Sequence, residues 1–296
     1  MNRILVPLDF SDPTFRQLQT VRSLCSAESV VELLHVQNSD DMDLTAVRRM
    51  LELHLRNLKS LVGDKTITTR SVLAEGPVAK TIQAEADRMD ADLIVVGSHH
   101  HGAIYDSLVG SVARRLIASC KRTLVVVPER SSRIAPTLPV VVVAVDFSPR
   151  CDEVVREAAA LARSTATRLK LLHVVPIPAE MLGLGPVNPK ATVVEDLRTA
   201  CMRAEARMDK FVSALALSIP VETEVRHGAV PDELVATSAS PEDGLLVLGS
   251  HGHGRTYELL LGSIAQAVVR KAEQPVMLVP VHERIPKWER TEALSV

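Results

Sequence analysis

Short apolar runs alternate along the chain with longer segments whose apolar residues recur every three or four positions. Runs such as Ile4–Leu8 and Leu245–Leu248 are typical of strands buried on both faces of a parallel sheet. The segment Leu44–Val62 has the helical period, with its apolar residues gathered on one face. This alternation predicts an α/β fold with a parallel, doubly wound sheet, right-handed crossovers and helices on both faces.

The first half of the chain is expected to form five strands and four helices. The expected strands are Ile4–Leu8, Val30–Val36, Thr66–Leu73, Leu93–Val96 and Leu124–Val127. The expected helices are Thr14–Ala27, Leu44–Val62, Val78–Met89 and Ser111–Cys120. In such sheets ligands bind at the carboxyl ends of the strands, near the point where the strand order reverses. A site is therefore expected at the ends of the first and fourth strands.

The second half of the chain repeats the first. The Asp-Phe-Ser of residues 9–11 returns at 146–148, and the Gly-Ser-His of 97–99 returns at 249–251. Equivalent residues are 138 positions apart near the second strand and 152 apart both at Gly76 and Gly228, after the third strand, and at Gly97 and Gly249, after the fourth, so the second copy has 14 additional residues between its second and third strands. The proline-rich stretch Pro176–Ala191 is the expected place of this insertion, as a surface loop.

The repeat divides the 296 residues into two domains of ordinary size. We expect a first domain over 1–128, a linker over 129–138, a second domain over 139–281 and a polar tail over 282–296. The only tryptophan, Trp288, lies in this tail, which either packs back on the body or frays.

Composition excludes several classes of protein. Hydrophobic residues make up 46% and charged residues 24%, as in globular proteins. Aromatic residues make up only 2% and the net charge is −2, which argues against a nucleic-acid partner. No apolar window approaches the length of a membrane span, so no membrane partner is expected. The four cysteines form no CxxC motif, which argues against zinc and favours a cytoplasmic location.

The candidate chemistry lies between Leu245 and Pro280. Glycines at 249, 252 and 254 follow a strand, and Gly262 then precedes the expected helix Ile264–Ala272, with Ser263 as its expected N-cap. A glycine-rich loop lets the backbone approach a ligand, and the free amides at a helix start bind anions. Two ordinary turns would give the same short pattern, so the spacing of the glycines has to decide between these interpretations.

That spacing, Gly249-x-x-Gly252 followed nine residues later by Gly262-Ser263, resembles the nucleotide-binding signature of the universal stress protein family. The likeness extends over nearly the whole chain, in the tandem two-domain form. It implies two flavodoxin-like (Rossmann-like) domains, each with a five-stranded parallel sheet of order 3-2-1-4-5. Because last strands pair across a two-fold axis in this family, we expect Leu124–Val127 to pair antiparallel with Val276–Val279 within one chain.

In this family the glycine pattern separates members that bind ATP from those that do not, and the pattern is intact in the second copy. The resemblance assigns Asp146 to the adenine and ribose end of the ligand and the backbone of Val174 to the adenine edge. Read alone, Asp146 is better explained as a capping carboxylate before the helix Cys151–Arg163, and the aligned glycine loop is what favours the ligand role. The loop and the helix start supply the remaining expected contacts, from Gly249, Ser250, His251, Gly252, Gly262, Ser263 and the amide of Ile264.

The first copy departs from the pattern at one position, where His100 stands in place of the second glycine. Its imidazole either closes the approach to the backbone or points outward and only changes affinity. The remaining candidate positions of the first copy are Asp9, Val36, Gly97, Gly110, Ser111 and Val112.

Other residues are read as structural. The run His99–His101 lacks partners at metal-ligand spacing, so no metal site is expected there. His35 and His173 lie inside apolar strand patterns and are expected to be hydrogen-bonded in the core.

No catalytic residues are assigned, because the sequence has neither a GxxxxGK[ST] phosphate loop nor a nucleophile elbow, and Arg255 is the only basic side chain of fixed charge in the second glycine loop. Binding is therefore favoured over turnover. The expected ligand is ATP, ADP or AMP, with or without Mg²⁺ held mainly by phosphate oxygens. Three functions stay open: an ATP-binding stress-response or signalling module that forms homodimers of the tandem chain, a slow ATPase, and a nucleotide-independent interaction protein.

Overall fold

The structure is a computed structural model of the chain. It describes residues 2–11, 14–37, 43–63, 65–98, 110–129, 137–177, 191–239, 244–250 and 262–280. Residues 130–136 of the expected linker and the tail 282–296 lie outside this description, as do both glycine loops.

The first copy alternates strands and helices, as its apolar pattern predicts. Its strands are β1 (Arg3–Pro7), β2 (Val30–Gln37), β3 (Thr68–Glu75), β4 (Leu93–Gly97) and β5 (Thr123–Val127). Its helices are α1 (Thr14–Leu24), α2 (Leu44–Val62), α3 (Val78–Arg88) and α4 (Ser111–Ser119). Helix α1 ends three residues before its predicted end because the Ser29 hydroxyl oxygen accepts the Ser26 amide at 2.9 Å, which competes with a further helical turn.

The second copy repeats this order. Its strands are β6 (Val140–Ala144), β7 (Arg168–Pro176), β8 (Val221–Gly228), β9 (Leu245–Gly249) and β10 (Val276–Val279). Its helices are α5 (Cys151–Ser164), α6 (Ala191–Leu215), α7 (Val230–Ala239) and α8 (Ser263–Lys271). Helix α6 has 25 residues where α2 has 19, so the 14-residue insertion is partly helical and extends beyond the stretch Pro176–Ala191 in which a loop was expected. No described helix is long and apolar enough to cross a bilayer.

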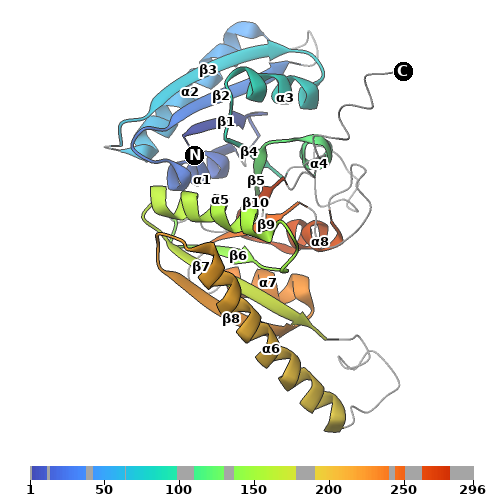
Figure 1. Cartoon of the computed structure of the whole chain (residues 1–296). Helices are drawn as coiled ribbons and strands as arrows, with labels where there is room; N and C mark the ends of the chain where they lie inside the picture. The colour runs from blue at the N-terminus through green and yellow to red at the C-terminus, as the bar shows by residue number, and fades with distance from the viewer. Residues whose placement is uncertain are drawn as a thin grey trace, which may run out of the picture.

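The two copies share one ten-stranded sheet with the order β3-β2-β1-β4-β5-β10-β9-β6-β7-β8 (Figure 1). All neighbouring strands within a copy are parallel, and β5 meets β10 antiparallel. Pairing of these last strands confirms the expectation for Leu124–Val127 and Val276–Val279. Val125 and Met277 occupy equivalent positions in the two copies and are paired with each other, so the pseudo-two-fold axis passes between them.

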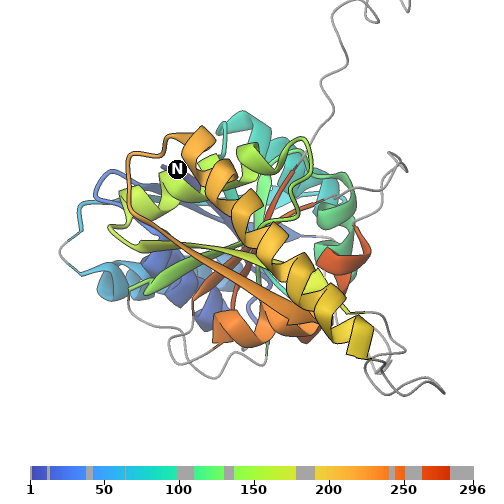
Figure 2. The same cartoon turned by 60° about the horizontal axis from the view of Figure 1, so that its bottom comes forward.

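Helices cover both faces of the sheet (Figures 1 and 2). Neighbouring strand residues point to opposite faces, so Ile4 belongs to one apolar layer and Leu5 to the other. Helices α1, α2, α5 and α6 cover the first layer, and α3, α4, α7 and α8 cover the second. Because both faces are buried in the middle of the sheet, β4, β5, β9 and β10 are almost entirely apolar, which is the pattern from which the fold was predicted. The outermost strands, β3 and β8, are more polar and more exposed.

Candidate functional site

The turn after the first strand has the same geometry in both copies. The Asp9 carboxylate accepts the Ser11 amide at 3.0 Å, and the Asp146 carboxylate accepts the Ser148 amide at 2.9 Å. The intervening phenylalanines are left-handed, with φ of 60° at Phe10 and 56° at Phe147. The N-cap of α5 is Arg150, and the Asp146 carboxylate accepts an amide within its own turn.

A histidine from the second strand supports each turn. His35 donates from Nδ1 to the Leu8 carbonyl at 2.8 Å, and its ring stacks on Phe10 with centroids 4.4 Å apart. His173 donates from Nδ1 to the Val145 carbonyl at 2.6 Å and lies 4.6 Å from Phe147. These contacts confirm that both histidines are hydrogen-bonded; His35 is buried in the core, whereas His173 is partly buried.

The outer face of each phenylalanine is covered by a different residue type in the two copies. His54 of α2 lies 5.7 Å from the Phe10 ring, and burial lowers the pKa of this imidazole. In the second copy the guanidinium carbon of Arg207 lies 4.5 Å from the Phe147 centroid. Sequence reasoning missed both residues, which lie on α2 and α6, the second helix of each copy.

The strand register places the predicted ligand-binding residues of each copy side by side at the carboxyl ends of adjacent strands. Val143 pairs with Leu171 and Val247, so Asp146, Val174 and Ser250 lie three residues further along adjacent strands. The Leu172 carbonyl accepts the Val145 amide at 2.8 Å, so the Val174 backbone, two residues on, points to the same side, past the end of β6. The first copy repeats this arrangement with Asp9, Val36 and Ser98. Both valine side chains are buried.

The start of α8 differs from the expectation. Its N-cap is Gly262, and Ser263 is its first helical residue. The Gly262 amide donates to the Ser250 carbonyl at 3.0 Å, so this amide is engaged by the protein itself. The first intrahelical bond runs from Gln266 to the Gly262 carbonyl, which leaves the amides of Ser263, Ile264 and Ala265 without an acceptor inside the helix.

The first copy starts α4 in the same way. Gly110 is the N-cap, and its amide donates to the Ser98 carbonyl at 3.2 Å. The neighbouring strand holds each serine in turn. The Ser98 amide donates to the Val127 carbonyl at 2.9 Å, and the Ser250 amide donates to the Val279 carbonyl at 2.8 Å. Each glycine loop therefore leaves and rejoins the fold at one point beside its fourth strand. The loop candidates His100, His251 and Gly252 lie outside the described residues.

A model of the universal stress protein family matches residues 1–128 and 139–280. The chain belongs to the universal stress protein family.

Relatives of this universal stress protein share about a quarter of its residues. One from Mycobacterium tuberculosis is 28% identical over 227 residues, covering 74% of this chain and 72% of that protein. Another from the same species is 26% identical over 199 residues, covering 66% of this chain and 59% of that protein, which is less than two thirds of its length.

A solved structure shows the same fold. The crystal structure of a universal stress protein from Archaeoglobus fulgidus has a TM-score of 0.65 at 20% identity, covering 95% of this chain and 97% of that chain. At that identity the likeness supports the fold alone.

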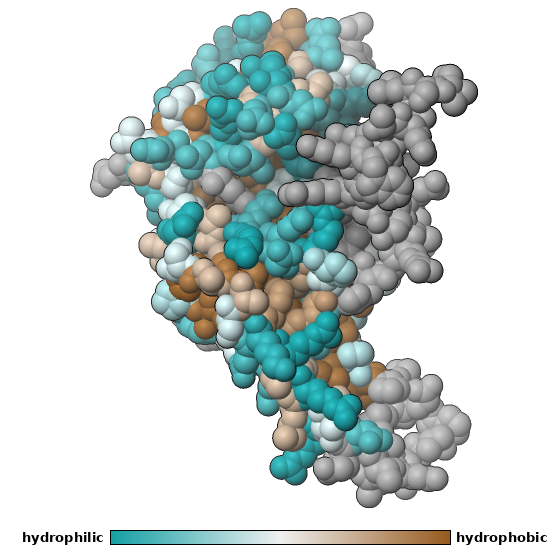
Figure 3. All heavy atoms as spheres, viewed as in Figure 1, coloured by the Kyte–Doolittle hydropathy of each residue, from teal (hydrophilic) through white to brown (hydrophobic). Residues whose placement is uncertain are grey.

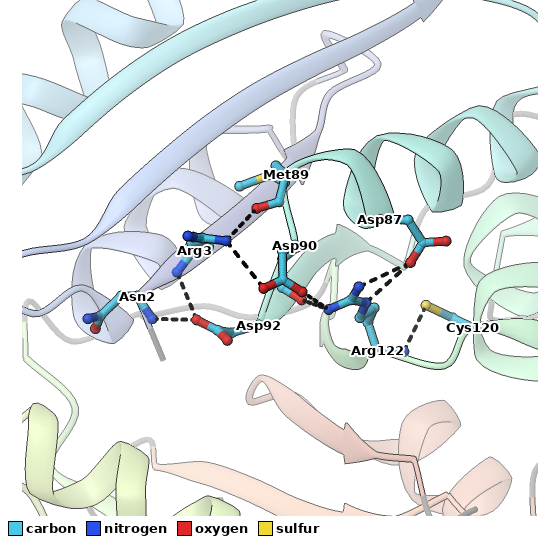
Figure 4. Close-up of polar contacts among 9 residues, drawn as sticks. Asn2, Arg3, Asp87, Met89, Asp90, Asp92, Cys120 and Arg122 are labelled. Carbon is cyan, nitrogen blue, oxygen red and sulfur yellow. Dashed lines mark hydrogen bonds and ion pairs between the residues drawn. The ribbon is translucent and has the colours of Figure 1, made fainter.

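In the first copy of this universal stress protein, the amino ends of the strands carry an ion-pair network (Figure 4). Arg122 donates to Asp90 at 2.9 Å and to Asp87 at 3.2 Å, and Arg3 pairs with Asp90 at 3.3 Å. These residues surround the starts of β1, β4 and β5, away from the candidate site. Among the described residues, no cluster of histidine, cysteine, aspartate or glutamate could hold a metal ion.

The cysteine nearest the second site is not set up as a nucleophile. Cys151 opens α5 behind the Asp146 turn and is 3% exposed. Burial raises the pKa of its thiol to about 11, so the thiol stays protonated at neutral pH. All four cysteines are free thiols.

Proposed function

We propose that this universal stress protein binds an adenine nucleotide at the carboxyl edge of its second copy and acts as a stress-response or signalling module. The observation that carries the proposal is the row formed by Asp146, Val174 and Ser250 beside the free helix start of α8. Ligands of doubly wound sheets bind at this kind of edge. The ligand is ATP, with ADP and AMP as the shorter members of the same class.

Each part of the row suits one part of the nucleotide. The Asp146 carboxylate suits ribose hydroxyls, and the Val174 backbone, which points past the end of β6, suits the edge of adenine. Gly249 and Gly252 let the loop backbone approach the ligand. The amides of Ser263 and Ile264, with the Ser263 hydroxyl, suit phosphate oxygens because they lack an acceptor within α8. Mg²⁺ would be held by phosphate oxygens and water.

Gly262 has a different role from the one its motif suggests. The Gly262 amide donates to the Ser250 carbonyl, so Gly262 fixes the helix start and its amide does not bind phosphate. This leaves Ser263 as the first residue that offers an amide to a ligand. The first copy has the same frame at Gly97, Gly110, Ser111 and Val112, and His100 is the feature that would weaken its affinity.

Binding is favoured over turnover. In-line phosphoryl transfer needs groups that position water and neutralise a leaving phosphate. The second glycine loop supplies Arg255 as its only basic side chain of fixed charge. Single-turnover hydrolysis of radiolabelled ATP by excess protein measures whether the site is a slow ATPase. We further propose a homodimer of tandem chains in the cytoplasm, which light scattering coupled to gel filtration and fractionation of cells test.

Ser263 allows a direct test of the free amide. Proline is tolerated at the first helical position, and Gly262, with φ −55° and ψ 145°, has the conformation favoured before proline. Ser263→Pro therefore removes one amide and one hydroxyl with little cost to the fold. We expect ATP affinity to fall about 10- to 100-fold, the size of a lost hydrogen bond to a charged group. Calorimetric titration measures this fall.

Two further variants separate the contributions. Ser263→Ala removes the hydroxyl alone and is expected to cost only a fewfold in affinity. Ser111→Pro makes the proline change in the first copy and reports how much of the total binding that copy carries. Mass spectrometry of ligand released from the purified protein identifies the nucleotide. Unchanged ATP affinity in Ser263→Pro would rule out the helix start as the phosphate site.

A further inference from the structure

Helix α6 holds the turn that carries Asp146. Arg207 lies over the Phe147 ring at 4.5 Å and donates from Nη2 to the Phe147 carbonyl at 3.3 Å. One helical turn further on, Phe211 meets the same ring edge-on, with centroids 5.8 Å apart. Phe147 directly follows Asp146, so two successive turns of α6 fix the backbone beside the carboxylate.

This turn depends on its surroundings. Phe147 has φ 56°, in the left-handed region that residues with a Cβ disfavour, and such conformations persist where neighbouring groups hold them. His173 supports the ring from the sheet side, and Arg207 with Phe211 supports it from α6. A displacement of α6 at residues 207–211 would therefore change the position of the Asp146 carboxylate.

The other half of α6 stands away from the body. No residue from Asp196 to Arg203 is buried, and the buried stripe begins at Ala204. Figures 1 and 2 show this end of the helix projecting beyond the sheet, and Figure 3 shows hydrophilic and hydrophobic residues interspersed along it. The shorter α2 of the first copy is buried already at Val47, near its start. Arg207 thus lies close to the boundary between the packed and the projecting parts of α6.

We propose that Arg207 is a positioning residue of the second nucleotide site, and that it couples binding at Asp146 to the projecting half of α6. The inference rests on the proposed function, and it adds that α6 changes its position or mobility when a nucleotide is bound. A ligand that engages Asp146 favours the arrangement in which Arg207 and Phe147 are in contact. By linkage, the same ligand then favours one position of α6.

Arg207→Met and Arg207→Lys test the positioning role. Methionine keeps the apolar stem and removes the charge and the donor, whereas lysine keeps the charge. We expect Arg207→Met to weaken ATP binding roughly fivefold and Arg207→Lys to recover most of that loss, because an exposed cation over an aromatic ring stabilises a contact by about that factor. Lys210→Met removes a charge from an exposed position of the same helix and should leave affinity unchanged.

Hydrogen exchange tests the coupling. In the unmutated protein, saturating ATP should slow amide exchange within residues 196–206 severalfold, although no residue of that segment is expected to touch the ligand. In Arg207→Met, ATP at saturation should no longer slow it. A response of this segment in Arg207→Met equal to that of the unmutated protein would overturn the coupling, as would no response in either protein while ATP is bound.

A nucleotide-free measurement separates this inference from the proposed function. Without any ligand, Arg207→Met should speed exchange of the amides of residues 146–150 several-fold, because their turn loses one of its supports. If the unmutated protein binds no nucleotide, the proposed function fails, and this measurement still decides whether Arg207 positions the turn. Unchanged exchange at 146–150 would overturn the positioning role whether or not ATP binds.

Discussion

The two copies carry opposite charges at one pair of equivalent strand positions. In the first copy Glu32 of β2 is in register with Arg70 of β3, and in the second copy Lys170 of β7 is in register with Glu222 of β8. Glu32 is fully buried and also bonds Arg88 at 2.9 Å, whereas Lys170 is partly exposed and pairs with Glu224. The fold accepts either sign at this position, provided that the charge finds a partner.

The turn beside the candidate site behaves in the opposite way. Both copies have aspartate, a left-handed phenylalanine and a supporting histidine there, with φ and ring distances that agree closely. A left-handed phenylalanine persists only where neighbouring groups hold it, whereas an ion pair can be exchanged as a unit. The copies therefore match in the turn and its histidine, and they differ in the sign of the strand charge and in the outer cover of the phenylalanine, which is His54 in the first copy and Arg207 in the second.

The largest expected effect comes from the position at which the copies meet. Met277 is 0% exposed and pairs with its equivalent, Val125, across the junction of β5 and β10. Met277→Ala should lower the free energy of unfolding by about 2–5 kcal/mol, because it leaves a cavity in a buried strand. Denaturant unfolding followed by circular dichroism measures the change.

The equivalent substitution Val125→Ala is the matched control. It removes fewer buried atoms and should cost less, in the same transition. If the continuous sheet makes the two copies one cooperative unit, hydrogen exchange should show both copies opening together in either variant. Opening of the second copy alone in Met277→Ala would show that the junction does not couple them.

The alternation of apolar runs was enough to predict the layers and nearly all elements, because parallel strands buried on both faces leave a simple signal. The pairing of β5 with β10 came from the family resemblance, since the apolar run Leu124–Val127 does not specify a partner. The extra turns of α6 were missed because the insertion was assigned, on the evidence of its prolines, to a loop within residues 176–191.

The candidate site was predictable in outline only. Glycine spacing located the helix start, but the engagement of the Gly262 amide by Ser250 depends on where the loop returns in space. Ser263 lies inside the helix because the Gly262 carbonyl accepts the first intrahelical bond, from the Gln266 amide. Arg207 has no local signal, because its partner Phe147 is 60 residues away and the two meet only after α6 packs on the sheet.

The next prediction concerns Glu32, which stands where the second copy has Lys170. Burial raises the pKa of Glu32, with Glu85 acting in the same direction and Arg70 and Arg88 opposing it, and its Oε1 atom has no hydrogen-bond partner. Glu32→Gln replaces the carboxylate by a neutral group of equal size. Arg70 and Arg88 are about half exposed and remain hydrated, so the variant should be stabilised at neutral pH on the order of 1 kcal/mol.

The sign follows from the raised pKa. Protonated Glu32 favours the folded state, so its contribution is complete below its unfolded pKa and is lost as the pH rises through the folded pKa. The advantage of Glu32→Gln should therefore be absent near pH 4 and grow upward from there, as urea titrations at several pH values would show. Lys170→Gln in the second copy should show the opposite trend, a cost that grows as the pH rises, because, against the effect of burial, Lys170 helps to lower the pKa of Glu224. A pH-independent effect of Glu32→Gln would contradict the assignment.

The smallest expected effect concerns Arg122, whose equivalent in the second copy is the buried Gln274. Arg122→Gln gives the first copy the residue of the second and removes the bonds to Asp87, Asp90 and the Ala91 carbonyl. Both aspartates are largely exposed, so the expected loss of stability is about 0.5–1 kcal/mol at low salt. Urea unfolding at low and at ~1 M salt measures it, because salt screens exposed pairs.

The contribution of this network to stability should also depend on pH, because the hydrogen bond from Arg122 lowers the pKa of Asp90. That contribution is present above the unfolded pKa of Asp90 and is lost as the pH falls through its folded pKa, so the cost of Arg122→Gln should shrink in acid as well as in salt. Arg56→Gln, which breaks the isolated exposed pair with Glu52 at 3.7 Å, should have no measurable effect. If the stability lost in Arg122→Gln is unchanged by salt and by acid, the loss comes from the hydrogen bond to the Ala91 carbonyl and not from the ion pairs. The two copies would then differ at this position in backbone support and not in charge.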